Sequence, residues 1–208
     1  MTTLIRNRFV AAFAVSTLCV LTACGGSDGA SDTASAAILE SSESLTVTGE
    51  ALPPLEGRED DAAAGMEAPV VVGATFDGTE ISIGGPTDGP TMLVFLAHWC
   101  SHCNDEIPEI IKLRNKGLLP DNLNIIGVST AVKPDRDNYP PSKWIVEKNW
   151  TWPMLADTAD SEAIQMYGGS GFPFVVMLNA DGTVNARKSG YEPASQTLDW
   201  ISAALLST

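Results

Sequence analysis

Residues 99–103 read Trp-Cys-Ser-His-Cys and hold the residue types best suited to chemistry in this 208-residue chain. They follow a short apolar run at 91–97, typical of a buried strand, and precede a helical pattern that stops at Gly117. Cys100 is therefore predicted to lie at a helix N-terminus, where unpaired backbone N–H groups favour a thiolate. Cys103 follows on the same helix face. The spacing predicts that Cys100 attacks a partner disulfide and that Cys103 resolves the mixed disulfide.

Other interpretations of the Cys-x-x-Cys pair are half of a zinc site and a structural disulfide. A four-sulfur zinc site is excluded, because the sequence has no second Cys-x-x-Cys pair. His98, Cys100, His102 and Cys103 form a candidate copper or zinc set, since thiolates and imidazoles suit both ions. Neighbouring residues at a strand end point in different directions, so four convergent ligands are not expected. We predict no metal and no cofactor beyond the redox-active disulfide of the pair.

The first 25 residues are typical of a targeting segment. Two arginines precede an apolar run at 9–20 that is short for a membrane span, and Leu-Thr-Ala-Cys-Gly follows at 21–25. Small residues before a cysteine resemble the bacterial lipoprotein box. The resemblance implies a signal peptide at 1–23 and lipidation of Cys24. The alternatives are an ordinary signal peptide cut nearby and an uncleaved anchor.

Charge and composition describe the next part of the chain. The formal net charge of −14 argues against nucleic acid and against a polybasic membrane patch, so the lipid on Cys24 is the predicted attachment to the membrane. Cys19 lies in the signal segment, which leaves the Cys-x-x-Cys pair as the free thiols of the mature chain. Residues 24–67 are rich in small residues and acids and predict a flexible acidic tether. Leu-Pro-Pro-Leu at 52–55 is alternatively a short docking motif.

A folded domain is expected over residues 68–208, as strands that alternate with helices. Asp160 or Ser161 is the expected N-cap of the third helix. Strands are predicted at 70–72, 81–83, 91–97, 123–128, 174–178 and 183–187, and helices from 101 to the stop at Gly117 and at 142–148, 160–167 and 194–206. This pattern indicates an α/β sandwich with a mixed central sheet, an N-terminal hairpin and flanking helices.

Several groups of residues together resemble the thioredoxin fold. They are Trp-Cys-x-x-Cys after an apolar strand, Gly-Phe-Pro at 171–173, and an ending of a hairpin followed by a helix. Glu-Ile-Pro at 106–108, the N-terminal hairpin and the added stretch at 123–167 are similar to the TlpA/ResA branch of membrane-anchored thiol-disulfide oxidoreductases. The resemblance covers about residues 68–206. Its most specific part is the string Trp-Cys-x-x-Cys-x-x-Glu-x-Pro.

The resemblance implies roles for individual residues. It makes Cys100 the exposed nucleophile and Cys103 the resolving thiol. Glu106 matches the active-site carboxylate of the family, placed to relay a proton to or from Cys103; the alternative is a solvated acid early in a helix. Pro173 matches the cis-proline of the family, whose neighbouring backbone pairs with a substrate peptide; the alternative is a trans proline at an edge strand.

Trp99 and Phe172, next to the predicted nucleophile and proline, are expected to contribute to substrate binding. The sequence departs from the thioredoxin pattern at two positions. Val94 stands where thioredoxin has a buried Asp, which removes one proton acceptor. Glu106 is therefore the expected proton acceptor at this site. His102 is a candidate redox-tuning residue, because a His at this place in DsbA-type oxidants stabilises the thiolate and makes the disulfide more oxidising. The alternative for His102 is an exposed polar residue.

The resemblance implies an extracytoplasmic, lipid-anchored thiol-disulfide oxidoreductase. Its expected partners are thiols or disulfides of exported proteins and a membrane thiol carrier that supplies electrons. A reductase, with cytochrome c apoproteins among its candidate clients, is favoured over a DsbA-like oxidant, the alternative that His102 supports. The rival from another class is a non-catalytic metal-binding or redox-sensing module. The sequence shows no apolar seam for dimerisation, so a monomer is expected.

Overall fold

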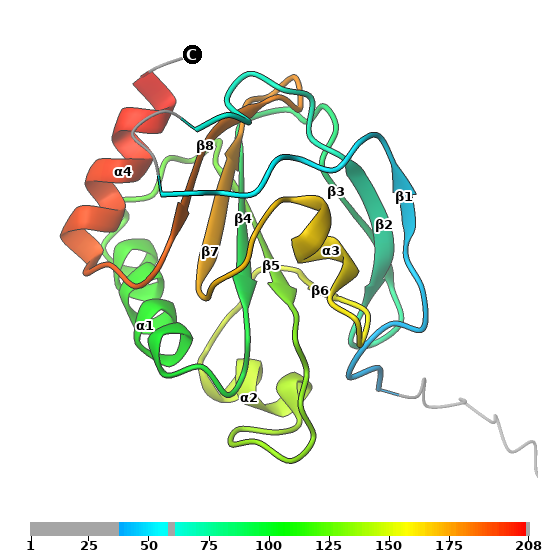
Figure 1. Ribbon diagram of the computed structural model, residues 1–208. Coiled ribbons are helices and arrows are strands. Elements are labelled where there is room, and N and C mark those ends of the chain that lie inside the picture. Colours follow the sequence, from blue (N-terminus) through cyan, green and yellow to red (C-terminus); the bar gives the residue numbers. More distant parts are fainter. Residues whose placement is uncertain (1–37, 58–60, 207–208) are drawn as a thin grey trace, which may run out of the picture. The chain divides into compact units, whose positions relative to one another are not determined.

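A central mixed sheet of eight strands organises residues 38–57 and 61–206, the part of the chain that the computed structural model describes (Figure 1). Its strand order is β1-β2-β6-β5-β4-β7-β8, and β3 also pairs with β2. The strands are Thr46–Thr48 (β1), Val70–Thr75 (β2), Glu80–Ile83 (β3), Thr91–Leu96 (β4), Asn124–Ser129 (β5), Met154–Ala156 (β6), Phe174–Leu178 (β7) and Val184–Ser189 (β8). The helices are Ser101–Asn115 (α1), Pro141–Glu147 (α2), Glu162–Met166 (α3) and Ala194–Leu206 (α4).

Strand β4 lies inside the sheet between β5 and β7, and all six of its residues are buried. It is parallel to β5 and antiparallel to β7, so that Val94 lies between Gly127 and Val175. Successive side chains of β4 point to opposite faces. One face packs against α1, α2 and α4, and the other packs against α3 and the segment before β2. The predicted α/β fold with a mixed sheet and flanking helices is thus confirmed.

All of the predicted strands and helices are present. Strand β7 and helix α4 have their predicted bounds, and the other predicted strands and helices begin and end within three residues of the prediction. Strands β1 and β6 were not predicted, because three residues are too few to show a strand period. No helix among residues 38–57 and 61–206 is long and apolar enough to cross a membrane.

The capping of α3 differs from the prediction. Ser161 occupies the N-cap position, but its φ of 63° is left-handed and its Oγ accepts a hydrogen bond from the N–H of Ala131. The first N–H groups of α3 are instead bound by Asp157 and Thr158: Asp157 Oδ1 accepts from the N–H of Ala163 at 2.8 Å, and Thr158 Oγ1 from the N–H of Glu162 at 3.1 Å. Asp157 is fully buried, and its bonds to backbone N–H groups explain how a carboxyl is accommodated there.

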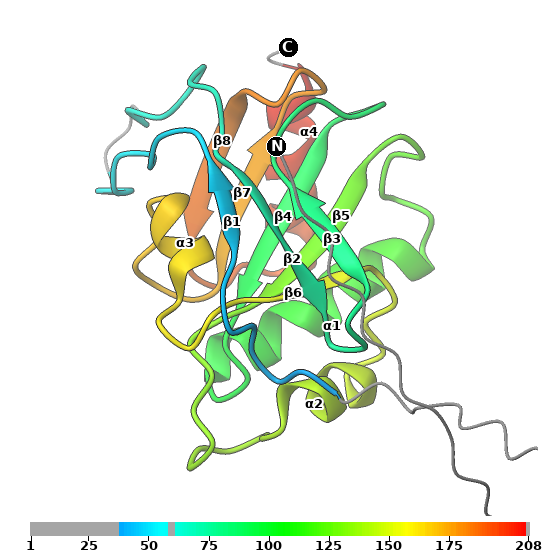
Figure 2. The same ribbon diagram turned by 90° about the vertical axis from the view of Figure 1, so that its right-hand side faces the viewer.

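The segment before residue 68 belongs to the fold, which corrects the prediction of a flexible tether that reaches residue 67. We call residues 38–57 and 61–67 the N-terminal strap. Its strand β1 pairs antiparallel with β2, as Figure 2 shows, and its Leu52 and Ala63 side chains are buried against the α3 face of the sheet. The N–H groups of Leu52 and Leu55 donate to the carbonyls of Met166 and Gly168. The Leu-Pro-Pro-Leu stretch therefore docks on its own domain.

Two polar contacts fix the strap. The buried Arg187 guanidinium donates to both carboxylate oxygens of Asp61, and its Nη1 donates to the carbonyls of Pro53 and Tyr167 at 2.9 and 2.7 Å. Near the start of the strap, a Glu40 carboxylate accepts hydrogen bonds from the N–H and the Oγ of one residue in the first turn of α2, Ser142, at 3.0 and 2.6 Å. The apolar residues of the strap lack a period, so the sequence predicts a tether, yet Leu52 and Ala63 pack against residues that are far away in sequence. The predicted signal peptide, Cys24 and the first part of the predicted tether lie outside the described residues.

Candidate active site

Cys100 lies between the end of β4 and the start of α1. It is the N-cap residue of α1, with an extended backbone (φ −79°, ψ 123°), and its N–H donates to the carbonyl of Ala97 at 3.0 Å. Its carbonyl accepts from the N–H and from the side-chain amide of Asn104. The strand followed at once by a helix is the arrangement predicted for the Cys-x-x-Cys pair. It leaves the Cys100 thiol half-buried at the surface and available to a partner.

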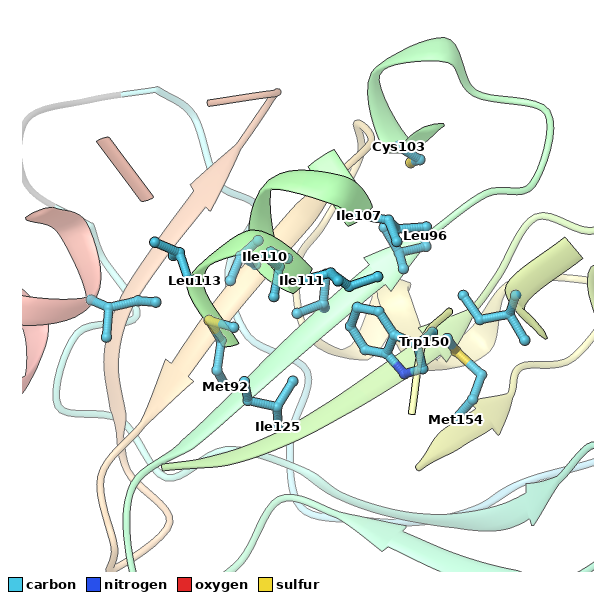
Figure 3. Packing of buried hydrophobic residues seen from close by; sticks show 14 of the residues in the cluster. Met92, Leu96, Cys103, Ile107, Ile110, Ile111, Leu113, Ile125, Trp150 and Met154 are labelled. Carbon is cyan, nitrogen blue, oxygen red and sulfur yellow. The ribbon is translucent and has the colours of Figure 1, made fainter. Parts of the chain in front are cut away.

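Cys103 has a different environment. Its side chain is fully buried in the first turn of α1, close to Leu96 and Ile107, as Figure 3 shows. Its sulfur accepts a hydrogen bond from the N–H of Ala97 at 3.4 Å. Burial raises the pKa of the Cys103 thiol well above its usual range, and the nearby Cys100 adds to this effect. Both cysteines are present as thiols, one exposed enough to react and one shielded.

The predicted substrate-binding residues meet at Cys100. The antiparallel register of β4 and β7 pairs Phe95 with Phe174, which brings the turn before β7 to the end of β4. The Phe172–Pro173 peptide in this turn is cis, as predicted, and the Phe172 carbonyl lies 3.8 Å from the Cys100 sulfur. The rings of Trp99 and Phe172 are in edge contact, with centroids 5.9 Å apart. Residues 72 positions apart thus form one surface around the thiol.

Glu106 lies one helical turn after Cys103 and is fully buried, unlike the solvated acid that the alternative prediction requires. Its Oε2 accepts a hydrogen bond from the N–H of Glu192 at 2.9 Å. Its Oε1 makes no hydrogen bond within the described part of the chain, and the ammonium of Lys188 lies 3.9 Å from it. Burial raises the pKa of Glu106, and the Glu192 N–H and Lys188 act in the opposite direction. The negative charge of Glu106 contributes to the raised pKa of Cys103, which couples the two groups.

Comparison with known proteins identifies the family. The family model for Redoxin matches residues 63–204. The chain belongs to the Redoxin family. A search of curated proteins found no match for this chain.

Several solved structures are similar to this Redoxin. StoA from Bacillus subtilis is 23% identical, with a TM-score of 0.53, over 67% of this chain and 98% of StoA. The thioredoxin domain of a thiol-disulfide oxidoreductase from Bacteroides vulgatus is 25% identical, with a TM-score of 0.52, over 67% of this chain and 97% of that domain. A DsbF homologue from Corynebacterium diphtheriae is 16% identical, with a TM-score of 0.57, over 74% of this chain and 99% of the homologue.

These likenesses confirm the predicted thioredoxin-like fold, and the TlpA/ResA resemblance is confirmed at the level of the family. Family and paired thiols together make the protein a thiol-disulfide oxidoreductase.

The two histidines of the candidate metal set have separate positions in this Redoxin. His98 is fully buried; its Nδ1 donates to the carbonyl of Asp137 at 2.7 Å, and its Nε2 accepts from the N–H of Lys133 at 3.1 Å. Both ring nitrogens are therefore occupied by the backbone of the loop after β5, and His98 holds this loop in place. His102 is exposed in the first turn of α1, and its role in redox tuning stays a prediction.

The loop at 130–140 contributes site residues that the sequence analysis did not single out. The indole N–H of Trp99 donates to the carbonyl of Ala131 at 2.8 Å. The ammonium of Lys133 lies 4.5 Å from the Trp99 ring centroid and the Arg136 guanidinium 5.6 Å from it. A cation over an indole contributes about 0.5–1 kcal/mol at an exposed site. The polar residues and prolines of this loop give no sign in the sequence that it packs beside the thiol.

Asn104 is a second residue that the sequence analysis missed. Its side-chain amide donates to the carbonyls of Cys100 and His98 at 2.8 and 3.2 Å, and its Oδ1 accepts from the indole N–H of Trp144 at 2.9 Å. Asn104 thus connects α2 with the start of α1. An Asn within a predicted helix carries no signal of such a role, because the contact depends on where α2 packs.

Proposed function

We propose that this Redoxin reduces disulfides in exported proteins, with Cys100 as nucleophile and Cys103 as resolving thiol. The observation that carries the proposal is the half-exposed Cys100 sulfur against the Phe172 carbonyl, with Cys103 shielded behind it. An extended client chain that pairs with the backbone at Phe172 would present its disulfide to Cys100. The burial of Cys103 disfavours a second thiolate, and a stabilised thiolate is what gives a disulfide its oxidising power.

The proposed reaction balances as two thiol–disulfide exchanges. The Cys100 thiolate attacks one sulfur of the client disulfide, which forms a mixed disulfide and releases the other client sulfur as a thiolate. Cys103 then loses its proton to a base, for which Glu106 is the candidate, and attacks the Cys100 sulfur. The bond from Cys100 to the client breaks, and the client sulfur leaves with the electron pair and takes up a proton. The client gains two electrons, and Cys100 and Cys103 end as an internal disulfide.

The reduction potential of this disulfide tests the direction. Tryptophan fluorescence across a series of thiol–disulfide buffers follows the reaction, because Trp99 lies directly beside Cys100. We expect a value near that of thioredoxin, about −270 mV, whereas a value near about −120 mV would make the protein a disulfide-forming oxidant and give His102 its tuning role. A protein that exchanges no disulfide in either direction would instead support the binding or sensing module.

The proposed location and partners rest on the N-terminal motif and the family resemblance. We infer that Cys24 carries lipid and holds the protein on the outer side of the cell membrane, where a membrane thiol carrier supplies electrons and apocytochromes c are candidate clients. Membrane fractionation of the native chain and of Cys24→Ser tests the anchor. We expect the native protein in the membrane fraction and the variant outside it; equal distribution of the two would contradict lipidation.

A further inference from the structure

Lys188 is a cation directed into the interior beside the active-site helix. It lies on β8 with a side chain that is 10% exposed, and its ammonium contacts a carboxylate oxygen of Glu192 at 2.5 Å. The same ammonium lies 3.9 Å from the buried carboxylate of Glu106 and 5.1 Å from the ring centroid of Trp200. No motif in the sequence points to this lysine. Burying an ammonium costs free energy unless the charge is paired. The two carboxylates and the indole around Lys188 supply that compensation.

The charges that face Glu106 come from three elements. Lys188 lies on β8, Glu192 lies in the turn before α4, and Glu109 follows Glu106 on α1. Glu109 is engaged elsewhere: it accepts a hydrogen bond from the N–H of Ala194 and pairs with Lys112. Glu192 and Glu109 repel a negative charge on Glu106, and Lys188 attracts it. The ionisation of Glu106 therefore depends on how the Lys188 ammonium is shared between Glu192 and Glu106.

We propose that Lys188 is a positioning residue that keeps Glu106 ionised at neutral pH, so that the carboxylate can accept the proton that Cys103 must lose. This inference rests on the proposed disulfide exchange. In the resolving step, the Cys103 S–H bond breaks and its proton passes to Glu106, while the new thiolate forms the bond to the Cys100 sulfur. The bond from Cys100 to the client breaks, and the client sulfur takes the electron pair. Lys188 touches neither sulfur and acts through the charge of Glu106.

The pH profile of insulin reduction by the native chain and its variants tests the proposal. Lys188→Met keeps a long unbranched side chain beside Trp200 and removes the charge. We expect the acid limb of its profile to move to higher pH, with a rate roughly tenfold lower at pH 6 and close to native at pH 9, because less Glu106 is ionised at low pH. Lys188→Arg should restore the native profile. Lys112→Met, which removes an exposed partner of a glutamate on the same helix, is the matched control and should leave the profile unchanged.

Glu192→Gln gives an effect of opposite sign and keeps the test open where Lys188→Met fails to fold. It removes the competing carboxylate and retains the backbone N–H that binds Glu106, so the acid limb should move to lower pH. A rate that falls by the same factor at every pH in Lys188→Met, or an acid limb that moves in neither variant, would overturn the role of Lys188. A native chain that reduces no insulin at any pH would contradict the proposed function itself.

Discussion

The two thiols of one short motif differ because their neighbours differ. Cys100 is half-buried at the end of β4, and Cys103 is fully buried one turn into α1. Burial disfavours a charged sulfur, so Cys103 stays protonated until a base removes its proton. The proposed division of labour between attacking and resolving thiol is consistent with this difference in exposure, and it was predicted in the sequence from the position of the helix N-terminus.

Replacing each cysteine in turn should therefore give different products. Cys100→Ser should abolish disulfide reduction, because the shielded Cys103 cannot reach a client. Cys103→Ser should still attack and then accumulate the mixed disulfide, because nothing resolves it. Mass spectrometry of the protein after incubation with a peptide disulfide measures the adduct. An adduct on Cys103 in the Cys100→Ser variant, at a rate similar to that of Cys103→Ser, would contradict these roles.

Glu106→Gln should affect exchange and stability in opposite directions. We expect at least about tenfold slower resolution at neutral pH, because general-base catalysis by a positioned carboxylate is lost. Burial raises the pKa of Glu106 in the folded state, so the stability this raised pKa contributes is present at acid pH and is lost as the pH rises through the folded-state value. Urea denaturation at pH 4 and pH 8 should show the variant gaining stability relative to the native chain as the pH rises. A constant difference at the two pH values would place the pKa of Glu106 near its ordinary value.

Among the elements, the N-terminal strap is joined to β8 by a buried charge pair. Arg187 is fully buried as a side chain and Asp61 is 14% exposed, and the guanidinium also binds two backbone carbonyls. Removing one partner of a buried pair leaves the other charge without compensation. The pair therefore connects the strap to β8, in addition to the apolar contacts of Leu52.

Asp61→Asn should lower the free energy of unfolding by about 2–4 kcal/mol at neutral pH. The Arg187 guanidinium holds the pKa of Asp61 below its usual range, so the contribution of the pair is lost as the pH falls through that lowered value. The difference between native and variant, measured by urea denaturation, should accordingly shrink at acid pH. Lys143→Met breaks the exposed pair with Glu147 and should change stability by less than about 0.5 kcal/mol. Equal effects of the two variants would contradict the importance of burial here.

At the scale of the molecule, sequence patterns predicted the strands and helices whose residues are continuous in the chain. The strand before Cys100, the helix after it, the hairpin and the last helix are each continuous in sequence and show their own period. The strap is different, because Glu40 contacts a residue 102 positions away and Arg187 contacts a carbonyl 134 positions away. The burial of Glu106 could not be predicted either, since β8 and the turn before α4 supply its surroundings. No sequence pattern reports contacts of this kind without knowledge of the packing.

A chain that begins at residue 68, the predicted domain start, should be much less stable than one that begins at residue 38. The shorter chain loses β1, the buried Leu52 and Asp61, and it leaves Arg187 unpaired. We expect a loss of at least about 3 kcal/mol in the free energy of unfolding. Urea denaturation of the two chains measures it. Equal denaturation midpoints would show that the strap does not stabilise the fold, as expected for a tether.

The Glu40 contact with α2 has a mechanical consequence. A pulling force applied to the chain at residue 38 would load this contact and the Leu39 bond to the Phe76 carbonyl before it reached β1 or the Arg187 pair. The turn between β2 and β3 and helix α2 would therefore bear the tension first. The indole N–H of Trp144 in α2 donates a hydrogen bond to Asn104, and the Asn104 amide donates one to the carbonyl of Cys100. Load on the N-terminal side of the protein is thus transmitted along a short path of hydrogen bonds to the residue that carries the nucleophile.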